Sequence, residues 1–299
     1  MAIAQPLDAW DDAVPRGRRA GLRTRSAGQA DSASSADTGL PGGSAMSVSK
    51  ALQMLDVFLG AAEPLSLSDI GRRVGLPKST AFRLLGQLTG SGYVVREGNK
   101  YSLSLHLFEL GNHFARGGVT GLRQVAAPYL GGLFQHTGFV VNLAVLDQGE
   151  IVYVDKIHGP RAPRTPSGVG GRMPALTTAL GKSMLAFSPG DVVGAAFAGR
   201  GARLTPYTVV APGLLRNQLG RVREHGVAYD REESALGLTC VGAPVLVDEQ
   251  AIAGISVSGP TGRFTPESVA PLVLRTANLI AAEFKRAVPA AGRATWKGE

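Results

Sequence analysis

Asp230, Glu232 and Glu233 follow a predicted turn at Gly226 and are candidates for acid–base chemistry. One of these carboxylates could orient a water or accept a hydroxyl group of a ligand, and an enzyme acting on a small carboxylic acid could use them as acid and base. An acidic loop exposed to solvent would show the same pattern. The cluster therefore leaves a ligand site, an active site and a plain surface loop as alternatives.

Catalysis would need further groups, such as a metal site or a nucleophile, and the sequence shows no motif with the spacing that such groups require. The five histidines never form a metal-binding spacing, and Cys240 stands in an apolar run that favours a small buried residue over a nucleophile. No Gly-x-Ser-x-Gly elbow occurs, and Gly181-Lys182-Ser183 lacks the leading glycine of a phosphate-binding loop because Leu176 stands there. We therefore expect no metal, no cofactor and no enzymatic activity.

A ligand site is easier to derive from the expected elements. Ser256 and Ser258 are two residues apart on a predicted strand, so both hydroxyls point to one face. Pro174 is expected to open a helix whose first turns contain Thr177 and Thr178, and the N-terminal amides of that helix would attract an anion. These groups predict a site for a small anion, although contact with solvent explains them almost as well.

The N-terminal half carries the pattern of a helix that reads DNA. Pro77 is expected at its first position, and one face is an apolar stripe of Ala81, Leu84, Leu85 and Leu88. Ser79 and Arg83 lie almost opposite that stripe, with Thr80 beside them. This outward face is small and polar around one arginine, so it can enter a groove and read base edges.

Two helices precede this one and a hairpin follows it. The first is expected from Ser47, with Ser47 or Ser49 as N-cap and an apolar face of Ala51, Leu52, Leu55, Phe58 and Leu59. The second runs from Leu67 to Val74, between Ser66 as N-cap and Gly75 as stop. Residues 93–96 and 101–103 predict a hairpin with its tip at Gly98-Asn99. This order is typical of a winged helix-turn-helix.

Positive charge gathers on the predicted helix pair and wing. Between residues 69 and 101 six basic residues stand against two acidic ones, a net charge of +4. We expect phosphate contacts from Arg72, Arg73, Lys78, Arg96 and Lys100, and base-edge contacts from Ser79, Thr80 and Arg83. A winged helix used only for protein contacts is the alternative, which this charge disfavours.

The composition of the whole chain limits the class of protein to which both halves belong. The chain has 299 residues, 31 Lys and Arg, 23 Asp and Glu, and one cysteine, which excludes an internal disulfide. Residues 1–45 predict a disordered tail or a mis-assigned start before Met46. No secretory signal or membrane-spanning run occurs, so we expect a soluble, cytoplasmic protein without a membrane partner.

We place a domain boundary near residue 117, after a predicted helix over 103–115. Residues 46–117 then form the DNA-binding domain with a linker helix. Residues 118–288 form a second domain, in which hairpins over 139–157 and 239–258 are flanked by helices, and 289–299 is a tail. Such hairpins predict an α+β fold with an antiparallel sheet.

Short motifs in a fixed order carry a family resemblance. They are Leu76-Pro77-Lys78-Ser79-Thr80-Ala81-Phe82-Arg83-Leu84-Leu85, Gly92-Tyr93-Val94, Thr178-Ala179-Leu180-Gly181-Lys182, Asp230-Arg231-Glu232-Glu233, Gly237-Leu238-Thr239-Cys240-Val241 and Ile255-Ser256-Val257-Ser258-Gly259-Pro260. Each motif is weak alone, but their order and spacing are specific. Over about residues 46–288 the chain resembles the IclR family of bacterial transcriptional regulators.

The resemblance implies a winged helix, a linker helix and a GAF-like effector-binding and oligomerisation domain. It implies a regulator whose operator binding is modulated by a small organic or aromatic acid. Its partners would be double-stranded DNA with a palindromic operator and further copies of the chain in a homodimer or homotetramer. Carried over by position, effector contacts fall on the backbone of Ala179 and Leu180 and on Asp230, Ser256 and Ser258, with Leu238 and Cys240 near the pocket.

Two positions depart from the family pattern. Leu176 stands where many relatives have a histidine, and Ala179 stands where relatives with the smallest ligands have a glycine. Both changes make the local wall more apolar. A larger or aromatic acid is therefore at least as compatible with the site as a glyoxylate- or pyruvate-like one.

Overall fold

The computed structural model describes residues 42–61, 63–114, 119–159, 168–199 and 203–287. These residues form two compact units that divide between His113 and Phe114. The tails predicted for 1–45 and 289–299 lie outside the described residues, except that residues 42–45 belong to the first helix.

The N-terminal unit is a winged helix-turn-helix, as predicted. Its helices are α1 (Gly42–Asp56), α2 (Leu67–Val74), α3 (Lys78–Gly90) and α4 (Leu105–Phe114). Its sheet has the order β1-β3-β2, with β1 (Leu65–Ser66), β2 (Val94–Glu97) and β3 (Lys100–Leu103). The sequence pattern did not predict β1, because a two-residue strand is too short to show a period.

Local capping explains where the helices of this unit begin and end. The Ser66 hydroxyl oxygen accepts a hydrogen bond from the Asp69 amide at 3.2 Å, and Gly75 ends α2 in the left-handed region. Helix α3 begins at Lys78, so Pro77 is its N-cap and not its first residue as predicted. The predicted stripe of α3 is buried: Ala81, Leu84, Leu85 and Leu88.

Helix α1 differs from the prediction in its start and in its buried face. It begins at Gly42, so Ser47 and Ser49 lie inside the helix and are not N-caps. Ala51, Leu55 and Phe58 pack in or against the core as predicted, but Leu52 is exposed and Met54 is fully buried. Leu59, also predicted to face the core, lies beyond the end of α1 and is exposed. Part of the predicted apolar stripe therefore lies outside the core of this unit.

The C-terminal unit is built on one antiparallel sheet of order β6-β5-β4-β9-β8-β7, which confirms the predicted α+β class. The strands are β4 (Val140–Asp147), β5 (Glu150–Ile157), β6 (Arg172–Pro174), β7 (Ala228–Arg231), β8 (Leu238–Val247) and β9 (Gln250–Pro260). The helices are α5 (Val119–Thr137), α6 (Ala179–Leu185), α7 (Gly190–Ala198), α8 (Pro212–His225) and α9 (Pro266–Ala287). Among the described helices of the chain, none is long and apolar enough to cross a membrane.

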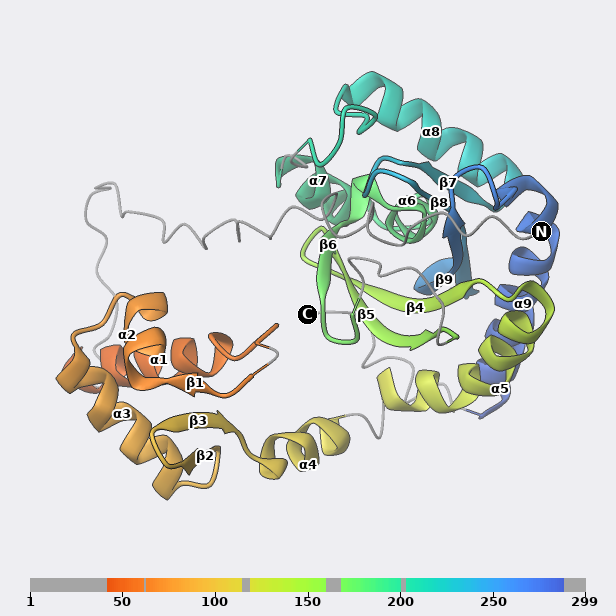
Figure 1. The fold of residues 1–299 in the computed structure, drawn as a ribbon. Helices are drawn as coiled ribbons and strands as arrows, with labels where there is room; N and C mark the ends of the chain where they lie inside the picture. Colours follow the sequence, from red (N-terminus) through yellow and green to blue (C-terminus); the bar gives the residue numbers. More distant parts are fainter. Residues whose placement is uncertain (1–41, 62, 115–118, 160–167, 200–202, 288–299) are drawn as a thin grey trace, which may run out of the picture. The chain divides into compact units, whose positions relative to one another are not determined.

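Helices cover both faces of this sheet (Figure 1). Helices α5 and α9 pack on one face, where Ile255 and Val257 of β9 join their apolar core. Helices α6, α7 and α8 form a second core with Ile151 of β5 on the other face. Because neighbouring side chains of a strand point to opposite faces, Ser256 and Ser258 face the α6 layer.

Three elements of this unit were absent from the prediction. Helix α7, strand β6 and strand β7 fall in stretches that the sequence presented as irregular or as loop. Asp230 lies on β7 and is buried, so the acidic cluster is not a solvent-exposed loop. The helix expected to open at Pro174 begins five residues later: Ala175–Thr177 form a 3-10 turn, and α6 starts at Ala179 behind Thr178 as N-cap.

Candidate functional sites

A small polar cavity lies between the sheet and the start of α6. All seven residues predicted for the effector site line it: Ala179, Leu180, Asp230, Leu238, Cys240, Ser256 and Ser258. Asn142, Tyr153, Thr178 and Ser234 complete the lining. The cavity offers about 20 Å³, which is room for about one water molecule. Leu176 is absent from this lining and packs in the core of the α6 layer. The prediction that Leu176 makes the wall of the effector site more apolar is therefore wrong.

Strand register places these residues in two adjacent rows across the sheet. Asp230 of β7 pairs with Cys240 of β8, which pairs with Ser258 of β9. In the next row, Gly242 of β8 pairs with Ser256, which pairs with Asn142 of β4. Side chains of such cross-strand neighbours meet on one face, so the polar groups converge although they are far apart in sequence.

Glycines let the backbone of α6 form the opposite wall. A Cβ atom at Gly242 would lie 2.9 Å from the carbonyl carbon and oxygen of Ala179 and 3.0 Å from the Leu180 nitrogen. At Gly181 it would lie 2.1 Å from the Ala175 carbonyl oxygen. Both positions therefore require glycine, and Gly242 presses the backbone of Ala179 and Leu180 against the sheet.

Besides the Asp230 carboxyl group, the pocket contains hydroxyl, amide and thiol groups that stay uncharged. The Asn142 side-chain amide donates to the hydroxyl oxygens of Ser256 at 3.3 Å and Ser258 at 3.4 Å. Burial raises the pKa of Tyr153 and of Cys240 well above their ordinary values, so the phenol and the thiol keep their protons. A buried, neutral thiol agrees with a packing role for Cys240 and does not provide a nucleophile.

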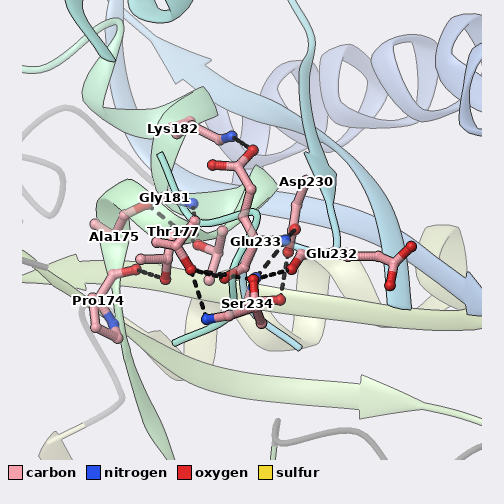
Figure 2. Close-up of polar contacts among 12 residues, drawn as sticks. Pro174, Ala175, Thr177, Gly181, Lys182, Asp230, Glu232, Glu233 and Ser234 are labelled. Carbon is pink, nitrogen blue, oxygen red and sulfur yellow. Dashed lines mark hydrogen bonds and ion pairs between the residues drawn. The ribbon is translucent and has the colours of Figure 1, made fainter. Parts of the chain in front are cut away.

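Asp230 is held in place by the loop that follows it. Its Oδ1 accepts hydrogen bonds from the backbone amides of Glu233 at 2.7 Å and Ser234 at 3.3 Å, and its Oδ2 accepts one from the Ser234 hydroxyl at 2.5 Å (Figure 2). Burial raises the pKa of Asp230 to about 6, while the hydrogen bond from Ser234 and the charge of Lys182 oppose the shift.

Lys182 and Glu233 form a buried ion pair behind this loop. The distance between Nζ and Oε1 is 2.5 Å, and the two residues are only 2% and 5% exposed (Figure 2). The sequence analysis missed the pair. Lys182 and Glu233 are 51 residues apart in the sequence. The pattern around Lys182 was compared only with a phosphate-binding loop, which it does not match. A lysine inside an Ala/Leu-rich helix was the available signal, since a buried lysine requires a partner.

The enzyme alternative finds no support in this arrangement. Asp230 and Glu233 are engaged as described, and the Glu232 carboxylate accepts a hydrogen bond from the Gly237 amide at 2.7 Å. Asp230 and Glu232 thus hold the loop together, and Glu233 ties the loop to Lys182 of α6 through one carboxylate oxygen. Within the described residues, no group of three His, Cys, Asp or Glu side chains could hold a metal ion.

The second candidate site is the outward face of α3. Lys78, Ser79 and Arg83 are exposed there, and Thr80 is half-buried. Phe82 is 52% exposed and lies three residues after Ser79 on the same helical face, so this face is not wholly polar as predicted. An exposed aromatic side chain can contact thymine methyl groups, and the sequence motif contained Phe82 without assigning it this role.

The predicted phosphate-binding residues differ in whether their charged groups already have partners within the unit. Lys78 and Lys100 make no ion pair among the described residues. Arg72 pairs with Asp69 at 2.6 Å, and Arg73 donates to the Val57 carbonyl oxygen at 3.4 Å. Arg96 donates to the Gly98 carbonyl oxygen at 2.9 Å and lies over the Tyr101 ring, which fixes it beside the hairpin tip. The structure therefore places all of these residues on the winged helix-turn-helix unit, but Arg72, Arg73 and Arg96 have internal partners.

A winged helix-turn-helix unit and a separate unit with a buried polar pocket, in one chain, are typical of one class of protein: a transcription regulator with an N-terminal helix-turn-helix and a separate C-terminal domain. Comparison with known proteins identifies the family. Residues 47–98 match the IclR helix-turn-helix domain, and residues 118–282 match the C-terminal domain of the bacterial transcriptional regulator IclR. The chain belongs to the IclR family of DNA-binding transcription regulators, which confirms the predicted resemblance.

Individual relatives agree with this assignment. The HTH-type transcriptional regulator XynR of Escherichia coli K12 is 38% identical over 221 residues, which cover 73% of this chain and 87% of XynR. The HTH-type transcriptional regulator KdgR of the same strain is 36% identical over 228 residues, 74% of this chain and 86% of KdgR. A solved IclR homologue from Microbacterium hydrocarbonoxydans, complexed with 4-hydroxybenzoate, has a TM-score of 0.74 at 26% identity and covers 80% of this chain and 99% of that one.

Proposed function

We propose that the chain is a regulator whose operator affinity changes when a small organic acid binds in the cavity between β9 and α6. The observation that carries this proposal is the convergence of three neutral side chains, Asn142, Ser256 and Ser258, on one buried cavity. Uncharged hydrogen-bond donors can stabilise a buried carboxylate without a competing buried cation.

The size of the cavity indicates how the effector acts. Its 20 Å³ holds about one water, and a ring-bearing acid needs several times that volume. Binding of an aromatic acid therefore requires the backbone of α6 or the loop over 232–237 to move away from the sheet. A ligand that prefers the opened arrangement shifts the population toward it, and this shift is what can alter operator binding. The related homologue complexed with 4-hydroxybenzoate makes an aromatic acid a suitable first probe.

A thermal-shift screen of small carboxylic acids, including 4-hydroxybenzoate, tests this proposal. An acid that binds the native state raises the midpoint of unfolding by mass action. Ser258→Val replaces the hydroxyl by a methyl group and adds a second one, so it removes the polar group and fills the small cavity, and it should abolish the shift. Thr208→Val, which removes a buried hydroxyl outside the pocket at nearly constant volume, should retain the shift. Stabilisation by uncharged compounds and by no acid would overturn the anion pocket.

We also propose that the N-terminal unit, which ends at His113, recognises DNA. We propose that Lys78, Lys100 and Arg96, with Arg72 and Arg73, contact phosphates of a palindromic operator. Ser79, Thr80 and Arg83 then reach base edges in the major groove. The chain would meet this DNA in the cytoplasm.

Exposed apolar side chains support a homodimer or a larger homo-oligomer. Leu105 of α4 is 71% exposed, and Phe108 and Leu110 of the same helix and Val48 and Leu52 of α1 are exposed as well. Exposed leucine and phenylalanine side chains gathered on two helices favour burial against a second copy. Phe108→Ser should therefore shift the sedimentation coefficient toward the monomer, whereas Phe82→Ser, an exposed phenylalanine on the DNA-facing side, should not. We propose that residues 118–288 add further contacts between copies.

A further inference from the structure

A second polar cleft lies on the C-terminal unit, between α8 and β7. Its volume is about 370 Å³, far larger than the cavity between β9 and α6. The two sites have different linings: Ser256 and Ser258 belong only to the first, and Gln218 and Arg221 belong only to the second. The cleft takes no part in the function proposed above.

Two of the lining side chains carry buried acceptor oxygens without donors. The Oε1 of Glu233 is paired to Lys182, but its Oε2 is buried and has no hydrogen-bond partner among the described residues. The Gln218 side-chain oxygen is also buried and without a partner in the part of the chain that the structure describes. Buried acceptors are normally satisfied, so these two oxygens lack donors that water or a bound molecule would supply.

Helix α8 also brings an exposed cation to the cleft. Gln218, Arg221 and His225 stand at positions i, i+3 and i+7 of α8 and so share one helical face. Arg221 is exposed and makes no hydrogen bond or ion pair within the described residues, whereas Arg231 on the opposite wall is bonded to Glu267. Arg221 is therefore a guanidinium available for an anion, with His225 one helical turn away.

These observations fix the chemistry of the ligand. The two buried oxygens of Glu233 and Gln218 need hydrogen-bond donors, and the Arg221 guanidinium needs a negative charge. We propose that this cleft is a second ligand site, which binds a small carboxylate that also carries hydroxyl or ammonium donors. Such a molecule places its donors on Glu233 and Gln218 and its carboxylate on Arg221. Hydroxy acids and amino acids share this chemistry and are the two sources to be distinguished.

Calorimetric titration of the full-length chain with four probes tests the proposal. Gluconate supplies a carboxylate with hydroxyls, and serine supplies a carboxylate with an ammonium group. Propionate has the charge without donors, and glycerol has donors without the charge. We expect gluconate or serine to bind one per chain, at least about tenfold more tightly than propionate or glycerol, since a hydrogen bond to a charged group accounts for that factor. Absence of binding by both gluconate and serine at millimolar concentration would overturn the proposal and leave water as the occupant.

Variants locate the bound probe. Arg221→Ala and Gln218→Leu should each weaken binding by about tenfold or more. Gln218→Leu removes an unsatisfied acceptor, so folding should be retained, which circular dichroism checks. Arg216→Ala is the matched control, because it removes a cation from the same helix. The Arg216 side chain lies over Phe197 and does not line the cleft. Ser258→Ala reports on the other cavity.

The pattern across these variants decides the outcome. Loss with the two cleft variants, and unchanged binding with Arg216→Ala and Ser258→Ala, supports the second site. Equal loss with Arg216→Ala would show a general charge effect. Loss only with Ser258→Ala would assign the probe to the cavity between β9 and α6. Either of these two results would overturn the proposal, without contradicting the regulator function.

Discussion

Replacing Asp230 by asparagine gives a quantitative test of the buried pocket. Burial raises the pKa of this carboxyl group from its ordinary value of 3.8 to about 6, so the folded chain binds the proton more tightly than the unfolded chain does. The stabilisation that follows is complete below pH 3.8 and is lost as the pH rises through 6. The contribution of Asp230 to the free energy of unfolding should therefore decrease as the pH rises over this range.

The size of the effect follows from the two pKa values. Each pH unit between them corresponds to about 1.4 kcal/mol, so the interval from 3.8 to about 6 is worth about 3 kcal/mol. Asparagine does not titrate, yet its side-chain oxygen can still accept from the Glu233 and Ser234 amides. The stability of Asp230→Asn relative to the wild type should thus rise by about 3 kcal/mol from about pH 4 to about pH 7.

Urea unfolding of both proteins across this pH range measures the difference. Asp191→Asn, which removes an exposed carboxylate on α7, is the control for the loss of one negative charge. A stability difference between Asp230→Asn and the wild type that does not depend on pH would refute the reasoning. So would a difference of opposite sign, because it would mean that the folded chain favours the ionised carboxylate.

Three further substitutions test other parts of the account. Arg83→Ala should lower operator affinity by about 1–3 kcal/mol and relax specificity at one base pair per half-site in fluorescence anisotropy titrations; equal loss on random DNA would make it a phosphate contact. Gly242→Ala should destabilise by about 1–3 kcal/mol in urea unfolding and weaken effector binding, because the new methyl group meets the Ala179 backbone; a neutral effect would contradict the close approach. Lys182→Met should cost about 3–5 kcal/mol by leaving Glu233 unpaired, and the double variant with Glu233→Leu should recover most of that loss; an additive loss would show that the pair is not coupled.

Patterns with a short period were predictable from the sequence. The stripe of α3 repeats every three or four residues and is buried as predicted, and capping by Ser66 and Gly75 depends only on neighbouring residues. The common face of Ser256 and Ser258 follows from the period of a strand. In each case the information lies within about ten residues.

Features that depend on long-range register were not predictable in this way. Asn142 meets Ser256 across 114 residues, because β4 and β9 are neighbours in the sheet, and no local pattern shows that pairing. Lys182 and Glu233 meet only because α6 packs on the sheet beside β7. The family resemblance, and not the spacing, therefore supplied the predicted roles of Ala179 and Leu180.

Exposed apolar residues mark a second limit of sequence patterns. Leu52 and Leu59 fit the apolar stripe predicted for the first helix, yet both side chains are exposed. A hydrophobic period indicates that a face is buried, but it does not say whether the partner is the same unit or another copy. The homo-oligomer proposed above gives such faces a partner.

The central claim is that an acid bound between β9 and α6 changes operator affinity, and one titration tests it most directly. Fluorescence anisotropy measures the Kd for a labelled operator fragment with and without the acid that gave the largest thermal shift, for the wild type and for Ser258→Val. A coupled effector should change the wild-type Kd by about fivefold or more and leave that of Ser258→Val unchanged. The same operator Kd with and without a saturating, bound acid would contradict the claim.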